Sequence, residues 1–95
     1  LKFTIVDTPI CLPVFTVFPN PTLGVVNIYT LPSNEDHIVE AALIDPRGEV
    51  LSSISGTVAQ ISEQFTNALQ GKRRGVYIIK LKECDKLISI HLLKL

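Results

Sequence analysis

The sequence predicts an all-β fold, an antiparallel β-sandwich of about seven short strands. Segments rich in β-branched residues recur along the chain, with apolar side chains at every second position. Turn-forming Pro, Gly, Asn and Asp residues separate these segments. A chain of 95 residues with 46% apolar side chains suits one domain with one modest core.

A rigid corner separates the first two expected strands, residues 15–18 and 25–31. It reads P-N-P-T-L-G from Pro19 to Gly24. Asn20 followed by proline suits the first two positions of a type I turn, in which the Asn side chain bonds to the backbone two residues on. Gly24 can adopt a positive φ and lead the chain into the next strand.

Residues 15–95 are expected to form the sandwich, and residues 1–14 a linker or N-terminal edge segment. A short apolar run at Phe3–Val6 is either a strand or the end of that linker. The pattern is typical of sandwiches that are immunoglobulin-like in outline. The remaining expected strands cover residues 38–44, 49–54, 57 to about 65, 75–82 and 87–93.

The clearest hairpin turn is Asp45-Pro46-Arg47-Gly48. Asp at the first position, Pro at the second and Gly at the fourth are preferred in a type I turn, which a glycine bulge often closes. We therefore expect this turn to join the strands at 38–44 and 49–54.

Residues 57–70 fit two structures. Ala59, Ile61 and Phe65 fit one face of a strand. We expect a strand through about Phe65, because the surrounding segments are β. The competing helical spacing is that of Val58, Ile61, Phe65 and Leu69.

Composition and motifs do not favour an enzyme, a metalloprotein or a nucleic-acid-binding protein. Nine basic and nine acidic side chains balance, so the chain has no field to steer a nucleic acid. His37 and His91 lack a second ligand at metal spacing, and we expect both at the surface or at a strand edge. Calcium has little support from the acidic residues Glu35, Asp36 and Glu40. We expect no catalytic residue, no metal and no cofactor.

Two features leave alternatives open. Cys11 and Cys84 could form a disulfide that closes a long loop, or they are two half-buried free thiols, which we favour because nothing in the sequence places them side by side. Gly71-Lys72-Arg73-Arg74-Gly75 is a basic tip between two glycines. It is either a solubilising loop end or a contact for an acidic partner.

Four motifs follow one another over roughly residues 15–95: V-F-P-N-P-T-x-G, V-V-N-I, L-I-D-P-R-G-E-V-L and G-V-Y-I-I-K-L, and a short apolar strand with a Lys near its end follows them. In this order they resemble the type A C-terminal sorting domain of type IX secretion cargo in Bacteroidetes. The residues that match the family's motifs are Pro19, Asn20, Pro21, Gly24, Asp45, Gly48, Val50, Gly75, Tyr77, Lys80 and Lys94.

The resemblance implies a seven-stranded sandwich that serves as an address on a larger cargo protein, which precedes it in the chain. It implies passage from the periplasm across the outer membrane through the type IX translocon. A sortase-like surface protease would then cut between Leu1 and Phe15, near the Thr8–Pro13 segment. The cargo would end at the cell surface or in the medium.

The final strand lies at a chain end and is the candidate recognition strand. An edge strand offers unpaired backbone groups to a partner by β-augmentation, and a bare edge could also pair two copies into a homodimer. Tyr77 is expected in the core with its hydroxyl at an edge, and the prolines and glycines of the motifs are expected to keep the shape. The apolar residues of the recognition strand are Leu87, Ile88, Ile90 and Leu92.

An alternative function is a small secreted immunoglobulin-like domain that binds or adheres to an unknown ligand. A carbohydrate-binding version would need a row of exposed aromatic rings. The chain has two Tyr, four Phe and no Trp, which disfavours such a row.

Overall fold

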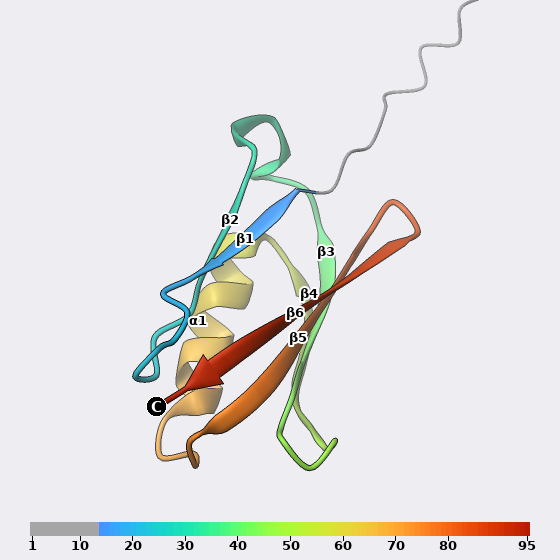
Figure 1. Cartoon of the computed structure of the whole chain (residues 1–95). Coiled ribbons are helices and arrows are strands. Elements are labelled where there is room, and N and C mark those ends of the chain that lie inside the picture. Colours follow the sequence, from blue (N-terminus) through green and yellow to red (C-terminus); the bar gives the residue numbers. More distant parts are fainter. Residues whose placement is uncertain (1–13) are drawn as a thin grey trace, which may run out of the picture.

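The computed structural model describes residues 14–95 (Figure 1). Expectations for Phe3–Val6, Cys11 and the cleavage segment therefore lie outside the described residues. The elements are β1 (Phe15–Phe18), β2 (Asn27–Thr30), a 3₁₀ turn (Pro32–Asn34), β3 (Val39–Ile44), β4 (Val50–Gly56), α1 (Val58–Leu69), β5 (Gly75–Glu83) and β6 (Lys86–Lys94).

The strands form two antiparallel sheets. The larger sheet has the order β4-β3-β5-β6, and the smaller sheet pairs β1 with β2. The predicted seven-stranded sandwich is thus corrected. The described residues hold six strands and one α-helix, and α1 packs against β2 and β4 in a layer that covers one face of the larger sheet (Figure 1).

The expectation of a strand in residues 57–70 is wrong. Thr57 caps the helix, because its hydroxyl accepts a hydrogen bond from the Gln60 backbone N–H while the Gln60 side chain accepts from the Thr57 N–H. The buried residues are those at helical spacing: Val58, Ile61, Phe65 and Leu69. The capping box and the helical period together outweigh the β character of the surroundings.

Helix α1 also covers the free edge of β2. The hydroxyl of Ser62 accepts from the Ile28 N–H at 2.9 Å. One turn later, the hydroxyl of Thr66 accepts from the Val26 N–H and donates to the Val26 carbonyl. Two hydroxyls at i and i+4 thus satisfy backbone groups that a neighbouring strand would otherwise pair.

The core lies between the larger sheet and the layer of α1, β1 and β2. Val26 and Ile28 are buried in this core, Leu92 of β6 is fully buried and Ile90 packs against the core, while Ile88 is half-buried. The fully buried residues that the larger sheet contributes to this core include Leu43, Ile79, Leu81 and Leu92. The opposite face of this sheet is left uncovered by any described element and carries Val50, Val76 and Leu93 at half exposure.

The predicted D-P-R-G turn of the larger sheet is present, and a second tight turn joins β5 to β6. The β3–β4 turn has Gly48 at φ +94°, and the Gly48 N–H donates to the Asp45 carbonyl while the Asp45 N–H donates to the Glu49 carbonyl, as expected for D-P-R-G closed at its glycine. A separate register shift lies between Leu43 and Ile44. The β5–β6 turn has two central residues with positive φ, Cys84 and Asp85, which is the twist preferred in two-residue hairpins. No helix among residues 14–95 is long and apolar enough to cross a membrane.

Candidate functional site: two joints and a basic groove

The first joint holds the P-N-P corner against the edge of β6, and we call it the corner joint. The Asn20 side chain donates to the His91 carbonyl at 2.8 Å and accepts from the Leu93 N–H at 3.0 Å. Thr22 continues this pairing, because its N–H donates to the Leu93 carbonyl and its carbonyl accepts from the Leu95 N–H. The side-chain amide of Asn20 and the backbone of Thr22 thus bond to the edge of β6 over residues 91–95.

The expected type I turn at Asn20 is wrong. Both Phe18–Pro19 and Asn20–Pro21 are cis peptide bonds. The Asn20 side chain bonds to a strand more than seventy residues away rather than to its own turn. Local turn chemistry could not show this, because the partner groups lie at the other end of the chain.

Thr22 was not singled out by the sequence, yet it is almost fully buried. Its hydroxyl donates to the Val25 carbonyl and accepts from the Gly24 N–H. Gly24 has φ +141°, which confirms the expected positive φ at this glycine. A threonine directly after P-N-P is the signal that could have identified this position, since Ser and Thr hydroxyls favour such local bonds.

The corner joint limits what β6 can offer to a partner. Leu92 is fully buried and Ile90 packs against the core, whereas Ile88, on the same face of β6, is only half-buried. Because backbone groups alternate in direction along a strand, Leu87 and Ser89 direct theirs to the same outer edge as His91 and Leu93. The part of that edge from Leu87 to Ser89 lies beyond the corner and receives no bond from it.

The second joint brings the β3–β4 turn to the start of β5, and we call it the turn joint. Asp45 holds the turn, because its Oδ1 accepts from the Arg47 N–H at 2.9 Å and from the Glu49 N–H at 2.8 Å. The Gly48 N–H donates to the Asp45 carbonyl, which closes the turn. This arrangement is the one predicted from D-P-R-G.

Gly75 touches this turn. It has φ +153°, and a Cβ added there would come within 2.8 Å of Cγ of Pro46. A glycine is therefore required for two reasons, a backbone conformation that side chains rarely adopt and the close approach of the Pro46 ring. The sequence predicted a structural role for Gly75 but not Pro46 as its partner.

Tyr77 fixes the loop that precedes β5. Its ring is buried at 2% exposure, and its hydroxyl donates to the Arg73 carbonyl at 2.6 Å. The expectation of a core ring with its hydroxyl at an edge is confirmed. Burial raises the pKa of the Tyr77 hydroxyl, the nearby Asp45 charge raises it further, and Arg73 opposes the shift.

The other motif residues lie along the larger sheet. Val50 begins β4 and is exposed, whereas Lys80 is half-buried on the face away from α1. Lys94 is 9% exposed, pairs with Gly75 in the β5–β6 register and bridges to Thr22. Lys94 thus lies between the corner joint and the turn joint.

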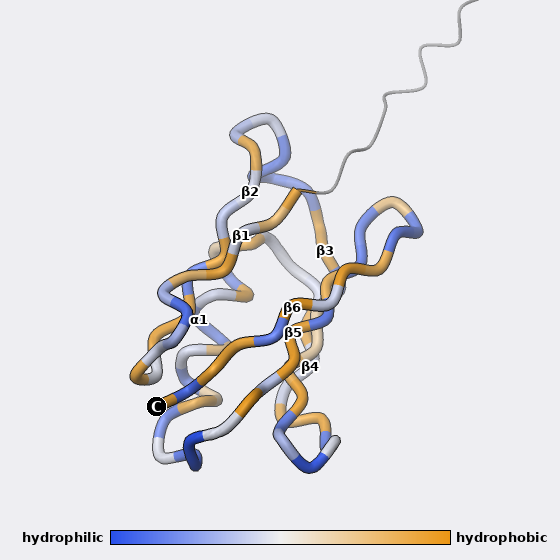
Figure 2. The backbone as a smooth tube through the Cα atoms, viewed as in Figure 1, coloured by the Kyte–Doolittle hydropathy of each residue, from blue (hydrophilic) through white to orange (hydrophobic). Residues whose placement is uncertain are grey.

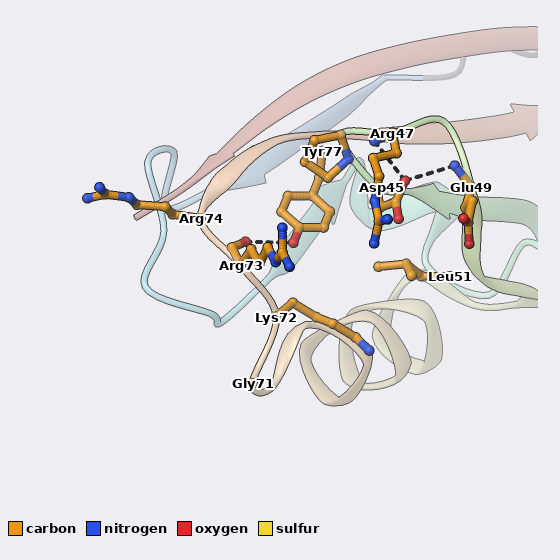
Figure 3. Close-up of a pocket in the computed structure, with 10 residues that line it drawn as sticks. Asp45, Arg47, Glu49, Leu51, Gly71, Lys72, Arg73, Arg74 and Tyr77 are labelled. Atoms are coloured by element: carbon orange, nitrogen blue, oxygen red, sulfur yellow. Dashed lines mark hydrogen bonds between the residues drawn. The ribbon is translucent and has the colours of Figure 1, made fainter.

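A groove of about 540 Å³ opens beside the turn joint, between the β3–β4 turn and the loop from α1 to β5 (Figure 3). Both Leu51 and Tyr77 contribute to its wall. The sequence singled out the basic tip at 71–75 but could not place Arg47 beside it. The charged residues that line the groove are Asp45, Arg47, Glu49, Lys72, Arg73 and Arg74, and the Arg74 side chain extends away from it (Figure 3).

The remaining candidate residues do not form a second site. His37 pairs with the buried Glu83 carboxylate, and His91 is exposed on β6. Between residues 14 and 95 no group of three or more His, Cys, Asp or Glu side chains could hold a metal ion, which includes the acidic cluster at 35–40. Cys84 takes part in a disulfide bond, so its interpretation as a free thiol is wrong; Cys11 lies outside the described residues.

Comparison with known proteins supplies one match. A family model described as a secretion system C-terminal sorting domain matches residues 16–94. No curated protein matches the sequence. The match spans both joints and the groove, from β1 to the end of β6.

Proposed function

The chain belongs to the family of secretion system C-terminal sorting domains, and from this premise we propose how its surface serves as an address. The domain is a C-terminal sorting signal for type IX secretion, which implies a cargo N-terminal to it and a secreted or cell-surface destination. The observation that carries this function is the family match over residues 16–94. No observation favours the alternative of a free-standing adhesion domain.

The proposed route takes the cargo from the periplasm across the outer membrane, as in Bacteroidetes. A sortase-like surface protease would then separate the cargo from the domain at a bond N-terminal to β1. The geometry suits this order of events, because Val14 is exposed and leads directly into β1 at the end of the domain opposite the turn joint (Figure 1). We also propose that the domain is not an enzyme, since the polar motif residues Asn20, Asp45 and Tyr77 bond to backbone groups of the fold itself.

We propose that the translocon pairs with β6 along the outer edge from Leu87 to Ser89. Edge strands are templates for β-augmentation, and the corner joint covers the other half of this edge. Recognition through the side chain of Leu92 is not open to a folded domain, because that side chain is fully buried, and Ile90 packs against the core. The same edge could pair two copies into a dimer, which sedimentation or light scattering of residues 1–95 would detect.

The export function is tested with a fluorescent reporter that carries a signal peptide and residues 1–95 at its C-terminus. In a Bacteroidetes host we expect surface or medium fluorescence that disappears when the translocon is disabled. Fluorescence that stays in the periplasm of both strains would contradict the function.

The pairing edge is tested in the same assay with Ser89→Pro. Proline removes the outward N–H and is tolerated at sheet edges, so we expect a folded domain with reduced export. Ser89→Ala is the matched control, which keeps the N–H and should be exported normally. Equal export of both variants, with both folded by circular dichroism, would rule out pairing at this edge.

A further inference from the structure

The basic groove carries an excess of positive charge that no ion pair within the described residues neutralises. Its cations come from two loops: Arg47 from the β3–β4 turn, and Lys72, Arg73 and Arg74 from the loop after α1. Asp45 and Glu49 also line it, and the Arg74 side chain extends away from it (Figure 3), so three cations face two carboxylates and one positive charge is in excess. No ion pair within residues 14–95 involves any of these four cations.

One of the two acidic residues, Asp45, is already engaged by the fold. Asp45 accepts two backbone N–H bonds inside its own turn, so it serves the turn rather than the cations. Figure 3 shows the side chains of Arg47 and Lys72 reaching into the same space, with Leu51 beside them. The groove therefore combines cationic walls with an apolar contribution from Leu51 and the Tyr77 ring.

The position of the groove leaves it accessible while cargo is attached. The chain enters β1 at the end of the domain where the loop after β2 lies, and the groove lies at the other end (Figure 1). Hydrophilic residues gather in the β3–β4 turn and at the start of β5 (Figure 2). The cargo end carries charges of both signs, with Glu35 and Asp36 in the loop before β3, and Asp85 beside Lys86 at the β5–β6 turn.

We propose that this groove docks an acidic peptide segment of the export machinery, a partner whose carboxylates alternate with apolar side chains. This inference rests on the proposed function and adds a second contact to the one at β6. Arg and Lys side chains recognise carboxylates by charge-assisted hydrogen bonds, and Leu51 and Tyr77 supply apolar surface between them. A concave site between two loops suits a peptide chain better than the flat surface of a membrane.

The turn joint gives the groove its shape. The Tyr77 hydroxyl fixes the Arg73 carbonyl, and the Pro46 ring against Gly75 holds the two loops at contact distance. Four residues that match the sorting family thus hold in place the two loops that carry the cations. None of the four supplies a positive charge to an acidic partner; they are Asp45, Gly48, Gly75 and Tyr77.

The test compares two variants with the same loss of charge. The groove variant is Lys72→Gln and Arg73→Gln, and the control variant is Lys82→Gln and Lys86→Gln, two exposed positions on β5 and β6 outside the sorting motifs. The probe is a fluorescein-labelled octapeptide that alternates Glu with Leu or Ser, and its Gln-for-Glu form is the neutral reference. We expect the wild type and the control variant to bind the acidic probe, and the groove variant to bind about tenfold more weakly.

Several outcomes would overturn the proposal. These are equal binding by the two variants, equal binding of the acidic and neutral probes, or amide NMR shifts of the wild type that map away from the groove. Binding to phosphatidylglycerol vesicles without binding to the peptide would assign the groove to a membrane instead.

The reporter assay separates this inference from the proposed function. If the wild-type reporter is exported through the translocon, the sorting function holds, and we then expect lower export of the groove variant than of the control variant. Equal export of the two would overturn the docking groove and leave the sorting function intact. Failure of the wild-type reporter itself would count against the sorting function, while the peptide-binding result would still decide the groove.

Discussion

The corner joint and the turn joint stabilise the fold by different means. The corner joint is a short stretch of hydrogen bonds along an exposed strand edge, made by Asn20 and Thr22 with β6. The turn joint depends on a buried ring and on close steric fit, with Tyr77 beneath the loop and Gly75 against Pro46. The first joint closes half of an edge, and the second fixes the shape of a groove.

This difference predicts how each joint responds to mutation. A tight steric contact tolerates few substitutions, because protein interiors are close-packed and few residue types adopt a positive φ. Edge hydrogen bonds near solvent are replaced in part by water, so their loss costs less. The variants below are ordered by the size of the expected effect.

Gly75→Ala should be the most damaging single change at the turn joint. The Cβ would meet the Pro46 ring in a backbone conformation that alanine rarely adopts, and we expect a loss of about 3 kcal/mol in the free energy of unfolding. Urea denaturation measures this loss. Gly71→Ala is the control, because Gly71 also has a positive φ but has nothing within 4 Å of an added Cβ, and it should lose about 1 kcal/mol.

The steric part of the Gly75→Ala effect can be isolated with Pro46→Ala. Removing the ring should recover part of the loss in the double variant, because only the backbone strain then remains. Equal losses with and without the Pro46 ring would show that this contact does not constrain Gly75.

Asn20→Ala should have an intermediate effect at the corner joint. Both hydrogen bonds to β6 disappear at an exposed edge, and we expect a loss of about 1–2 kcal/mol in the free energy of unfolding. Asn27→Ala, an exposed position in β2, should change stability by less than about 0.5 kcal/mol. Indistinguishable stabilities of these two variants would contradict the role assigned to Asn20.

Tyr77→Phe should cost about 1 kcal/mol at neutral pH, because the Arg73 carbonyl loses its partner while the ring remains. The pKa of Tyr77 is raised in the folded state above its ordinary value of 10.0. The wild type should therefore keep its full advantage below that pH and lose it as the pH rises toward the folded pKa, since only the unfolded chain releases the proton in that window. Urea denaturation at a series of pH values measures the gap, and a gap that widens above pH 10.0 would contradict this account.

Asp45→Asn should produce the smallest change. The amide oxygen can still accept from the Arg47 and Glu49 N–H groups, so the fold should lose less than about 1 kcal/mol. The pKa of Tyr77 should fall, because the Asp45 charge contributes to its rise. Ultraviolet titration of the tyrosines, in a Tyr29→Phe background, would detect this shift, and an unchanged pKa would contradict the proximity of the two groups.

Local chemistry accounts for the parts of the fold that the sequence predicted. D-P-R-G specifies its own turn through Asp45 and Gly48, and the alternation along 75–82 and 87–93 predicts the strands that the structure has as β5 and β6. The family itself was predicted, because the order of several weak motifs carries more information than any one of them.

The errors arise where distant residues decide the outcome. Residues 57–70 carry both periods in part, and the capping box of Thr57 and Gln60 decides for the helix once Ser62 and Thr66 find the edge of β2. Asn20 was assigned to a local turn because its partners, His91 and Leu93, lie at the opposite end of the chain. The groove was missed as a unit, since its cations come from loops about twenty-five residues apart.

The central claim is that the P-N-P corner clamps the terminal strand, and amide hydrogen exchange of Leu93 tests it most directly. Leu93 donates to Asn20, whereas the neighbouring Leu92 pairs with Tyr77 in β5. We predict that Asn20→Ala speeds exchange at Leu93 about tenfold relative to Leu92, because only the first amide loses its acceptor. Unchanged exchange at Leu93 relative to Leu92 would contradict the clamp.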